Sequence, residues 1–426
     1  MSHTIHNADI KEWAKNYEGE LFDGIFCDPP YELGFMGKGW DSSGIAFDVE
    51  MWQDIYKLLK PGGHLLAFSG SRTYHRMAVA IEDAGFEIRD QLIWMYGSGF
   101  PKSLNIGKAV DKIQGNERED LGVRHGATGK RNSKIYGDRP VLNDPDYQPR
   151  ITKGTSEWEG YGTALKPAHE PCVLARKPID KGMTVAGNVL KYGAGGLNID
   201  GTRVGTEQIE QGRQVADSSS YHDGLKPTER TIATGRFPAN LIHDGSDEVE
   251  AVFPQTKVEI HNKPASSIFG NEDDGGSRGF SVKDSGSASR YFYTAKAGKR
   301  ERNAGLEGFE ERPLENHSST FNVRMENGVA TNARTDTARQ NHHPTVKPLA
   351  LTKYLATLIK PPTGGRLLVP FSGSGSEMIG ALQAGWSEVV GVELTEEYIP
   401  IAEARIKYWL AEMAKEDEQP EQGQLV

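Results

Sequence analysis

The chain has 426 residues, of which 37% are hydrophobic, and it carries a formal net charge of −10 at pH 7. No apolar run approaches the roughly 20 residues of a membrane span and the first residues lack a signal-peptide pattern, so we expect a cytoplasmic protein with no membrane partner. Cys27 and Cys172 are the two cysteines, with no Cys or His cluster at metal spacing, which argues against a disulfide framework or a metal site.

The acidic charge is unevenly distributed along the chain. Residues 116–345 carry 31 basic and 32 acidic side chains, a net charge of −1, which leaves −9 for the two flanks. The net charge of the whole chain argues against a nucleic-acid partner, but the nearly neutral middle leaves room for a local basic surface. Residues 411–426 form an acidic end that we interpret as a frayed helix and a disordered tail.

The first elements predict a βαβ unit. Residues 4–9 suit a short strand, residues 10–17 have helical spacing of apolar side chains, and residues 21–27 form a second apolar strand. Asp9 lies between the first strand and the helix, where it would cap the helix that begins at Ile10.

The second strand ends in Asp28-Pro29-Pro30-Tyr31. The two prolines cannot donate ladder hydrogen bonds, so the strand must stop there and continue as a rigid loop. A carboxylate, a carbonyl without a neighbouring N–H and a flat ring suit a planar ligand with an amino group: Asp28 and the Pro29 carbonyl would hold both N–H bonds while Tyr31 stacks on the ring. Such contacts would draw the amine nitrogen towards a more nucleophilic geometry. The alternative is an ordinary Pro-Pro turn with a solvated Asp28.

These four residues resemble the catalytic motif of the DNA amino-methyltransferases. Members of this family transfer a methyl group from S-adenosylmethionine (AdoMet) to adenine N6 or cytosine N4. The resemblance implies that Asp28, Pro29, Pro30 and Tyr31 are catalytic, and that Asp9 lies near the adenine end of AdoMet. For Asp9 the capping role stays an equal alternative.

Helices and strands continue to alternate after this motif. Residues 51–59 and 73–84 read as helices and residues 64–68 and 86–96 as buried strands, an order typical of a doubly wound α/β sheet. The glycine-rich stretch 32–41 predicts a mobile loop that could cover DNA, or simply pack on the core, and Lys102 could contact phosphate or be solvated.

The middle of the chain is less regular. Residues 116–162 lack apolar periodicity and predict an inserted loop, and residues 163–178 return as a strand. Residues 179–335 contain no cofactor motif, and we interpret them as the target-recognition region. Within it, 235–240 and 289–293 combine Arg with aromatic residues, which can contact phosphates and bases or serve packing alone.

A second motif follows the middle region. Residues 366–370 predict a buried strand, 378–384 a helix and 389–392 another strand, and the first of these ends in the glycine-rich turn Phe371-Ser372-Gly373-Ser374-Gly375-Ser376. Such a turn before a helix N-terminus suits a polar ligand, and Glu393 is placed to accept both hydroxyls of a ribose. The turn alone would also fit any dinucleotide-binding fold or a structural loop.

The stretch His343-Pro344-Thr345-Val346-Lys347-Pro348 upstream of this turn resembles the AdoMet-binding half of the same methyltransferases. The resemblance implies that Lys347 and the turn lie near the methionine carboxylate of AdoMet. Family members usually have an acid where Val369 stands here, and Glu377 also departs from the usual small residue. Glu377 could supply the missing negative charge or could be an acid of the helix N-terminus.

The motif order, catalytic first and AdoMet-binding last, resembles the circularly permuted β group of phage- and bacterial-type enzymes. It implies a Rossmann-like AdoMet-dependent methyltransferase fold with a circularly permuted seven-stranded sheet and an inserted target-recognition region. The expected parts are 1–115 as the catalytic half, 116–162 as an inserted loop, 163–178 as a returning strand, 179–335 as the recognition region, 336–410 as the AdoMet-binding half and 411–426 as the tail.

The sequence thus predicts a DNA methyltransferase that modifies adenine N6 in double-stranded DNA by base flipping, with AdoMet as its cofactor and a homodimer left open. Three alternatives remain: methylation of cytosine N4, a non-catalytic DNA-binding protein of methyltransferase descent, and methylation of RNA or protein. We find no restriction-nuclease motif in the sequence.

Overall fold

The structure is a computed structural model. It describes residues 1–33, 43–97, 99, 103–123, 150–211, 231–259, 283–295, 298, 300–313, 322–326, 329–333, 338–343 and 345–418. The chain divides into two compact units. The first comprises Met1–Gly97, His169–Gly305 and Val346–Val426, and the second comprises Ser98–Ala168 and Leu306–Thr345.

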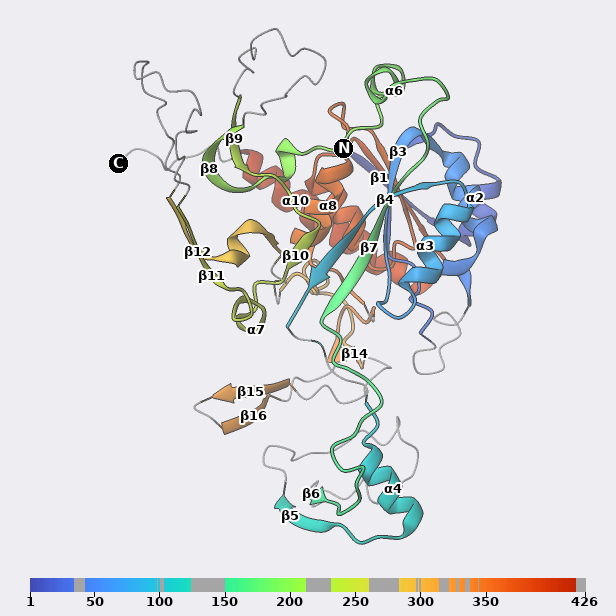
Figure 1. Cartoon of the computed structure of the whole chain (residues 1–426). Helices are drawn as coiled ribbons and strands as arrows, with labels where there is room; N and C mark the ends of the chain where they lie inside the picture. The colour runs from blue at the N-terminus through green and yellow to red at the C-terminus, as the bar shows by residue number, and fades with distance from the viewer. Residues whose placement is uncertain are drawn as a thin grey trace, which may run out of the picture. The chain divides into compact units, whose positions relative to one another are not determined.

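A nine-stranded sheet forms the centre of the first unit, in the order β1-β19-β18-β2-β3-β7-β4-β10-β13 (Figure 1). Its strands are β1 (Ser2–Asn7), β2 (Phe22–Cys27), β3 (Leu59–Phe68), β4 (Glu87–Met95), β7 (His169–Arg176), β10 (Leu241–His243), β13 (Tyr293–Thr294), β18 (Arg366–Pro370) and β19 (Glu388–Glu393). Neighbouring strands are parallel except β7, which is antiparallel to both β3 and β4. The predicted Rossmann-like fold is confirmed. The seven predicted strands are present, and the short β10 and β13 extend the sheet.

Helices cover both faces of this sheet (Figure 1). The helices are α1 (Ile10–Lys15), α2 (Val49–Leu58) and α3 (Tyr74–Asp83) on one face, and α8 (Leu349–Ile359) and α9 (Ser376–Gln383) on the other, where α10 (Ile399–Glu418) adds Ile406. Each face has its own cluster of buried apolar side chains, so the strands between them are apolar on both sides. No helix in the described parts of the chain combines the length and the apolar character that a membrane span requires.

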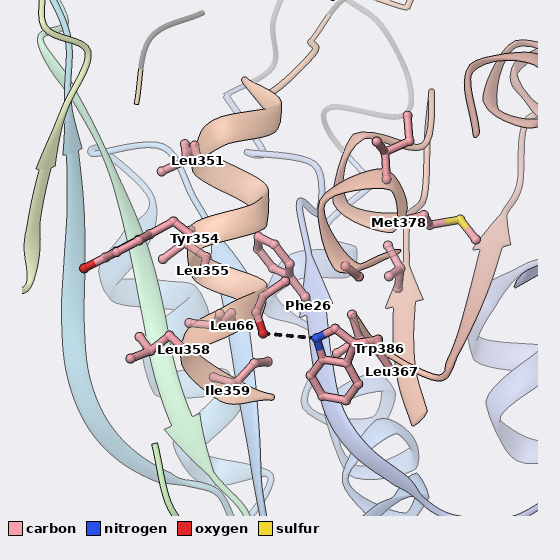
Figure 2. Packing of buried hydrophobic residues seen from close by; sticks show 14 of the residues in the cluster. Phe26, Leu66, Leu351, Tyr354, Leu355, Leu358, Ile359, Leu367, Met378 and Trp386 are labelled. Atoms are coloured by element: carbon pink, nitrogen blue, oxygen red, sulfur yellow. Dashed lines mark hydrogen bonds between the residues drawn. The ribbon is translucent and has the colours of Figure 1, made fainter. Parts of the chain in front are cut away.

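Helix α8 packs over the strand that delivers the Asp-Pro-Pro-Tyr motif. Phe26 of β2 and Leu66 of β3 are fully buried beneath it, and Trp386 closes its far end by donating a hydrogen bond from Nε1 to the Ala356 carbonyl at 3.0 Å (Figure 2). Each side chain of this size contributes about 1.5–3 kcal/mol on burial. Gly24 of β2 lies against the same Trp386, and a Cβ there would come within 2.9 Å of the indole ring. Strand β2 is therefore held in place by close packing of its middle.

The rest of the first unit comes from residues 179–305. Its elements are α6 (Val185–Tyr192), β8 (Val204–Gln211), β9 (Thr231–Arg236), α7 (Asp247–Glu250), β11 (Gln255–Glu259) and β12 (Lys283–Ser287), with 3₁₀ turns at Asp200–Thr202 and Ala288–Tyr291. Strands β8 and β9 form one antiparallel pair, and β11 and β12 form another. Because β10, β13 and the buried Ala295 also come from this region, part of the expected recognition region belongs to the core sheet.

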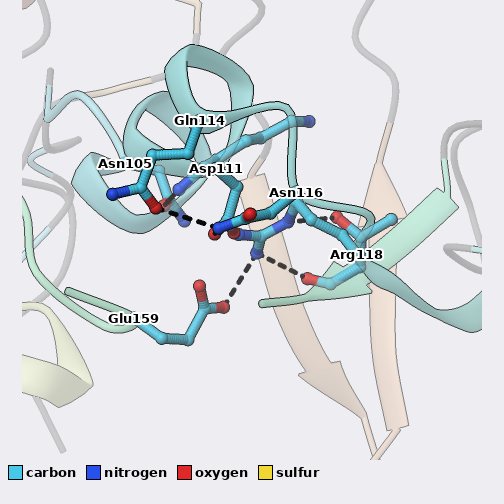
Figure 3. Close-up of polar contacts among 8 residues, drawn as sticks. Asn105, Asp111, Gln114, Asn116, Arg118 and Glu159 are labelled. Carbon is cyan, nitrogen blue, oxygen red and sulfur yellow. Dashed lines mark hydrogen bonds and ion pairs between the residues drawn. The ribbon is translucent and has the colours of Figure 1, made fainter. Parts of the chain in front are cut away.

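In its described residues the second unit has one helix and three short antiparallel ladders. These elements are α4 (Ile106–Gln114), β5 (Glu119–Val123) with β6 (Arg150–Lys153), β14 (Arg312–Pro313) with β17 (Ala338–Arg339), and β15 (Asn322–Glu326) with β16 (Val329–Ala333). Arg118 connects α4 with the segment that carries Glu159. Its guanidinium pairs with the buried Asp111 of α4 and, at 2.9 Å, with Glu159 (Figure 3).

Two sequence expectations need correction. Strand β3 begins at Leu59 rather than at His64, because Leu59 pairs with Phe22 across a bulge. Residues 116–162 are not wholly a loop, since β5 and β6 pair within them. Helix α10 continues to Glu418, which agrees with the helix expected at the start of the acidic end. Residues 34–42, which belong to the expected mobile loop, Lys102, and residues 124–149 and 419–426 lie outside the described residues.

His64 should make the stability of the first unit fall in acid. It is only 4% exposed, and burial, followed by the charges of Arg176 and Arg89, lowers its pKa from 6.5 to about 3. Between those values the unfolded chain takes up a proton that the folded protein excludes, so stability present above pH 6.5 is lost as the pH falls. From pH 8 to pH 5 we expect the free energy of unfolding to fall by about 2 kcal/mol more in the wild type than in His64→Gln.

Urea denaturation at several pH values measures this difference. His75→Gln, which changes an exposed histidine on α3, is the control and should keep the wild-type dependence. Parallel curves for the wild type and His64→Gln would show that His64 is not held neutral.

Candidate active site

The predicted site residues gather at one edge of the sheet. Eight strands end at this edge because they are parallel, and Asp28, Phe371 and Glu393 lie at the ends of β2, β18 and β19. The antiparallel β7 instead begins there, which brings Glu170 opposite Trp94 near the end of β4. Open α/β sheets bind their ligands at this edge.

Asp28 and Lys347 form a buried ion pair. Lys347 Nζ lies 2.6 Å from Asp28 Oδ2, and the two side chains are 5% and 12% exposed. The other carboxylate oxygen, Asp28 Oδ1, is also buried and has no hydrogen-bond partner among the residues that the structure describes. A buried carboxylate oxygen without a donor is costly, so Oδ1 is an acceptor available to a ligand.

The Lys347 ammonium is shared among several groups. It lies 3.0 Å from the Tyr31 hydroxyl and 3.3 Å from Glu170 Oε2. Burial by itself lowers the pKa of Lys347, but the carboxylates of Asp28, Glu170 and Glu377 outweigh it and the pKa ends above its ordinary value. The ammonium therefore stays charged. The structure places Lys347 beside Asp28, and its expected role at the methionine carboxylate of AdoMet stays a prediction.

Tyr31 is held at both ends. Its hydroxyl donates to Glu170 Oε2 at 2.9 Å, and its backbone carbonyl accepts from Thr73 Oγ1 at 2.7 Å. Burial, followed by the charges of Asp28 and Glu170, raises the pKa of Tyr31 well above its ordinary value, so the phenol stays neutral and can donate. Of the two prolines before it, Pro29 is buried and Pro30 is half-buried.

The glycine-rich turn is fastened by Glu393. The Glu393 carboxylate accepts the Gly373 N–H at 2.7 Å and the Thr395 N–H at 2.8 Å. Burial raises the pKa of Glu393, while these two hydrogen bonds oppose the rise. Gly375 has a φ of 80° and begins α9, a conformation that an L side chain adopts only with strain.

A buried arginine completes the turn. Arg405 of α10 is fully buried and donates to the Ser374 carbonyl, to Ser374 Oγ at 3.0 Å and to Ser376 Oγ at 3.2 Å. Burial lowers the pKa of Arg405 to about 10, so it remains a cation near neutral pH. The hydroxyl of Ser372 is buried and has no partner within the described part of the chain.

Glu377 adds a buried acid in the first turn of α9. It is 5% exposed, and burial, followed by the charge of Asp28, raises its pKa to about 7, against the opposing charges of Lys347 and Arg405. Val369, which stands where the family usually has an acid, is fully buried in β18.

Asp9 caps α1. Its carboxylate accepts the Lys11 N–H at 2.8 Å, which confirms the capping role weighed from the sequence. Asn7, two residues earlier, is aligned with Glu393 in the sheet, so Asp9 also follows β1 at the edge of the site. Its expected place near the adenine of AdoMet stays a prediction.

Glu170 and Arg405 are the site residues that sequence reasoning missed. Glu170 could have been found from strand direction, because a strand that hairpins with 86–96 must begin where that strand ends. Arg405 gave no such signal, since one arginine in an amphipathic helix is ordinarily solvated.

Comparisons with known proteins agree with this geometry. A family model described as "DNA methylase", for N6 and N4 methyltransferases, matches residues 22–404. The type II methyltransferase M.HindIII of Haemophilus influenzae is 25% identical over 189 residues, which cover 42% of this chain and 50% of that protein. M.HpaI of Haemophilus parainfluenzae is 30% identical over 105 residues, 23% of this chain and 33% of that protein. The chain thus spans half or less of the length of these curated relatives.

Two solved structures are also similar. The crystal structure of the M1.HpyAVI–SAM complex has a TM-score of 0.38 at 14% identity and covers 95% of this chain and 98% of that one. The cytosine-N4-specific PvuII DNA methyltransferase has a TM-score of 0.41 at 12% identity, covering 95% and 86%. The match of the family model over most of the chain is decisive: the chain belongs to the DNA methylase family of AdoMet-dependent N6 and N4 amino-methyltransferases.

Proposed function

We propose that this protein transfers a methyl group from AdoMet to adenine N6 in double-stranded DNA, at a specific site and after flipping the target base out of the helix. The buried, unpartnered Asp28 Oδ1 supports this function most directly. It is a fixed acceptor beside the aromatic ring of Tyr31, and an exocyclic amine carries the N–H donors that it lacks.

The residues of the glycine-rich turn suit AdoMet. Glu393 would hold the ribose hydroxyls, Asp9 would lie near the adenine, and the turn Phe371-Ser372-Gly373-Ser374-Gly375-Ser376 would line the methionine part, where the Ser372 hydroxyl is buried and lacks a partner among the described residues. Glu377, whose pKa is raised to about 7 by burial, would ionise more fully beside a cationic ligand. When bound, AdoMet supplies a methyl group made electrophilic by its sulfonium.

The protein groups would then prepare the amine nitrogen. Asp28 Oδ1 accepts one amine N–H and the Pro29 carbonyl the other, which weakens conjugation of the nitrogen lone pair with the ring. Lys347 contacts Asp28 at Oδ2, which leaves Oδ1 as the acceptor for the amine. Tyr31 offers its ring face to the flipped base. No covalent intermediate with the protein is required.

The DNA-contacting surface is proposed to include the two segments that pair Arg with aromatic residues. These segments lie together, because the guanidinium of Arg236 is 5.1 Å and that of Arg290 is 4.3 Å from the centre of the Tyr291 ring. Phe237 beside them is 62% exposed. Stacked guanidinium groups and an exposed ring suit phosphates and unstacked bases.

Loss of Glu393 should weaken AdoMet binding. For Glu393→Ala we expect the Kd for AdoMet to rise about 10- to 100-fold, because a charged acceptor of two hydroxyls is lost and the Gly373 and Thr395 N–H groups lose their partner. Calorimetry measures this Kd without DNA. Glu388→Gln, at the other end of β19, is the control and should bind like the wild type. An unchanged Kd in Glu393→Ala would remove Glu393 from the cofactor site.

Sequencing of genomic DNA from a methylation-deficient bacterial host that expresses the protein tests the proposed function. We expect N6-methyladenine at one short recognition sequence, and none in cells that express Asp28→Ala. N4-methylcytosine at such a sequence would overturn the choice of base. Unmodified DNA, despite AdoMet binding by the purified protein, would overturn the activity.

A further inference from the structure

Glu170 reaches the site from the strand that runs against its neighbours. It lies at the start of β7, and its side chain is 22% exposed. One oxygen, Oε2, accepts the Tyr31 hydroxyl at 2.9 Å and lies 3.3 Å from Lys347 Nζ. The same two groups face the reacting end of the site, since Lys347 also holds Asp28 and Tyr31 belongs to the catalytic motif.

We propose that Glu170 is a positioning residue for the methyl transfer, which fixes the ring of Tyr31 and shares the charge of Lys347. The inference rests on the proposed function. Glu170 is assigned no contact with base or cofactor and acts only through these two neighbours.

The contacts of Tyr31 explain the first part of this role. Its backbone is tied to Thr73 and its hydroxyl to Glu170, so the ring is held at its two opposite ends. The hydroxyl donates to Glu170 and accepts from Lys347 at 3.0 Å, so both hydrogen-bonding functions of the phenol are used. A ring fixed in this way can stack on a flipped base without first being ordered.

The charges explain the second part. Lys347 lies between two carboxylates, with Asp28 at 2.6 Å and Glu170 at 3.3 Å. It also lies 4.7 Å from the centre of the Phe68 ring, which offers no counter-charge, and the charge of Glu377 acts on it as well. Without Glu170 a larger share of the ammonium charge would fall on Asp28, and Asp28 Oδ1 would become a weaker acceptor for the amine.

Three variants isolate this role. Glu170→Gln keeps an acceptor for the Tyr31 hydroxyl but removes the charge, and Glu170→Ala removes both. Glu87→Gln is the matched control. Glu87 Oε2 pairs with Arg176 Nη2 at 2.6 Å, and Arg176 lies at the opposite end of β7 from Glu170. Thermal unfolding checks that each variant is folded.

The first measurement needs neither DNA nor AdoMet. In protein labelled with ¹³C at tyrosine Cζ, the Tyr31 signal is identified by its loss in Tyr31→Phe. We expect this signal to move in Glu170→Gln and Glu170→Ala, because the hydroxyl changes its acceptor, and to stay in place in Glu87→Gln. A signal that does not move in either Glu170 variant overturns the contact and with it the inference.

The second measurement is steady-state methylation of DNA that carries the recognition sequence. Glu170→Ala should lower kcat about 10- to 100-fold and leave KM for AdoMet within about twofold. Tyr31→Phe should also lower kcat, and the double variant should lie within about threefold of the slower single one, because both changes remove the same hydrogen bond.

The possible failures are distinguishable. A wild-type protein that methylates no DNA contradicts the proposed function. A wild type that methylates while Glu170→Ala retains its kcat contradicts only the role of Glu170. Losses that multiply in the double variant, or a kcat loss matched by Glu87→Gln, would show a general structural effect and also overturn the inference.

Discussion

Replacing Asp28 by alanine should lower the methylation rate by two orders of magnitude or more, on the order of 3 kcal/mol, and leave the Kd for AdoMet within about threefold. The proposed reaction depends on Asp28 Oδ1 as the acceptor for the target amine, and alanine has no replacement for it. Asp28→Asn should be almost as slow, because its amide oxygen is uncharged and its amide nitrogen can only donate. Single-turnover methylation and calorimetry with AdoMet measure the two effects.

A second lysine–carboxylate pair provides the control for Asp28. Asp48 lies 2.6 Å from Lys11, the same distance that separates Asp28 from Lys347, but it caps α2. Asp48→Asn should therefore leave the methylation rate unchanged. Turnover of Asp28→Ala within tenfold of the wild type would remove Asp28 from the reaction.

Lys347→Met should lower the free energy of unfolding by about 3–5 kcal/mol at pH 8, because it leaves the carboxylates of Asp28 and Glu170, whose side chains are only 12% and 22% exposed, without their cation. Urea denaturation at this pH measures the effect.

The control for Lys347 is an exposed pair. Lys415 is 70% exposed and contacts Glu412, which is itself 36% exposed, at 2.6 Å, so Lys415→Met should leave the free energy of unfolding nearly unchanged. A Lys347→Met variant as stable as this control would show that the buried pair contributes nothing net to stability.

Local sequence patterns predicted the elements that carry the two motifs. The strand at Arg366–Pro370 has the predicted bounds, because glycines precede it, its apolar residues are continuous and Pro370 ends it. The strands β10 and β13 were not predicted. They have three and two residues, which is too few to show the alternation of apolar and polar side chains that indicates a strand. Their place in the sheet depends on the pairing of β10 with β4 and of β13 with β10, which is a tertiary property.

The contacts between motifs could not be predicted from either motif alone. Lys347 and Asp28 are 319 residues apart in the chain, and they meet because α8, which Lys347 precedes, packs over β2. Local propensity says nothing about such pairing. The resemblance to known methyltransferases supplied the residues of the site, but it did not indicate Glu170 as the partner of Tyr31. The boundaries of the recognition region remain predictions.

The pairing of β1 with β19 has a consequence for synthesis of the protein on the ribosome. β1 pairs with residues 388–393, so it waits for almost 400 residues to be made, roughly 20–80 seconds at bacterial and eukaryotic elongation rates. The glycine-rich turn emerges shortly before β19, and Lys347 only about 20 residues before the turn. Nascent chains would hold β2 and Asp28 long before they hold the glycine-rich turn or the cation that pairs with Asp28. Interrupted synthesis should therefore yield polypeptides that lack β18 and β19 of the sheet, lack the proposed cofactor site and are open to proteolysis.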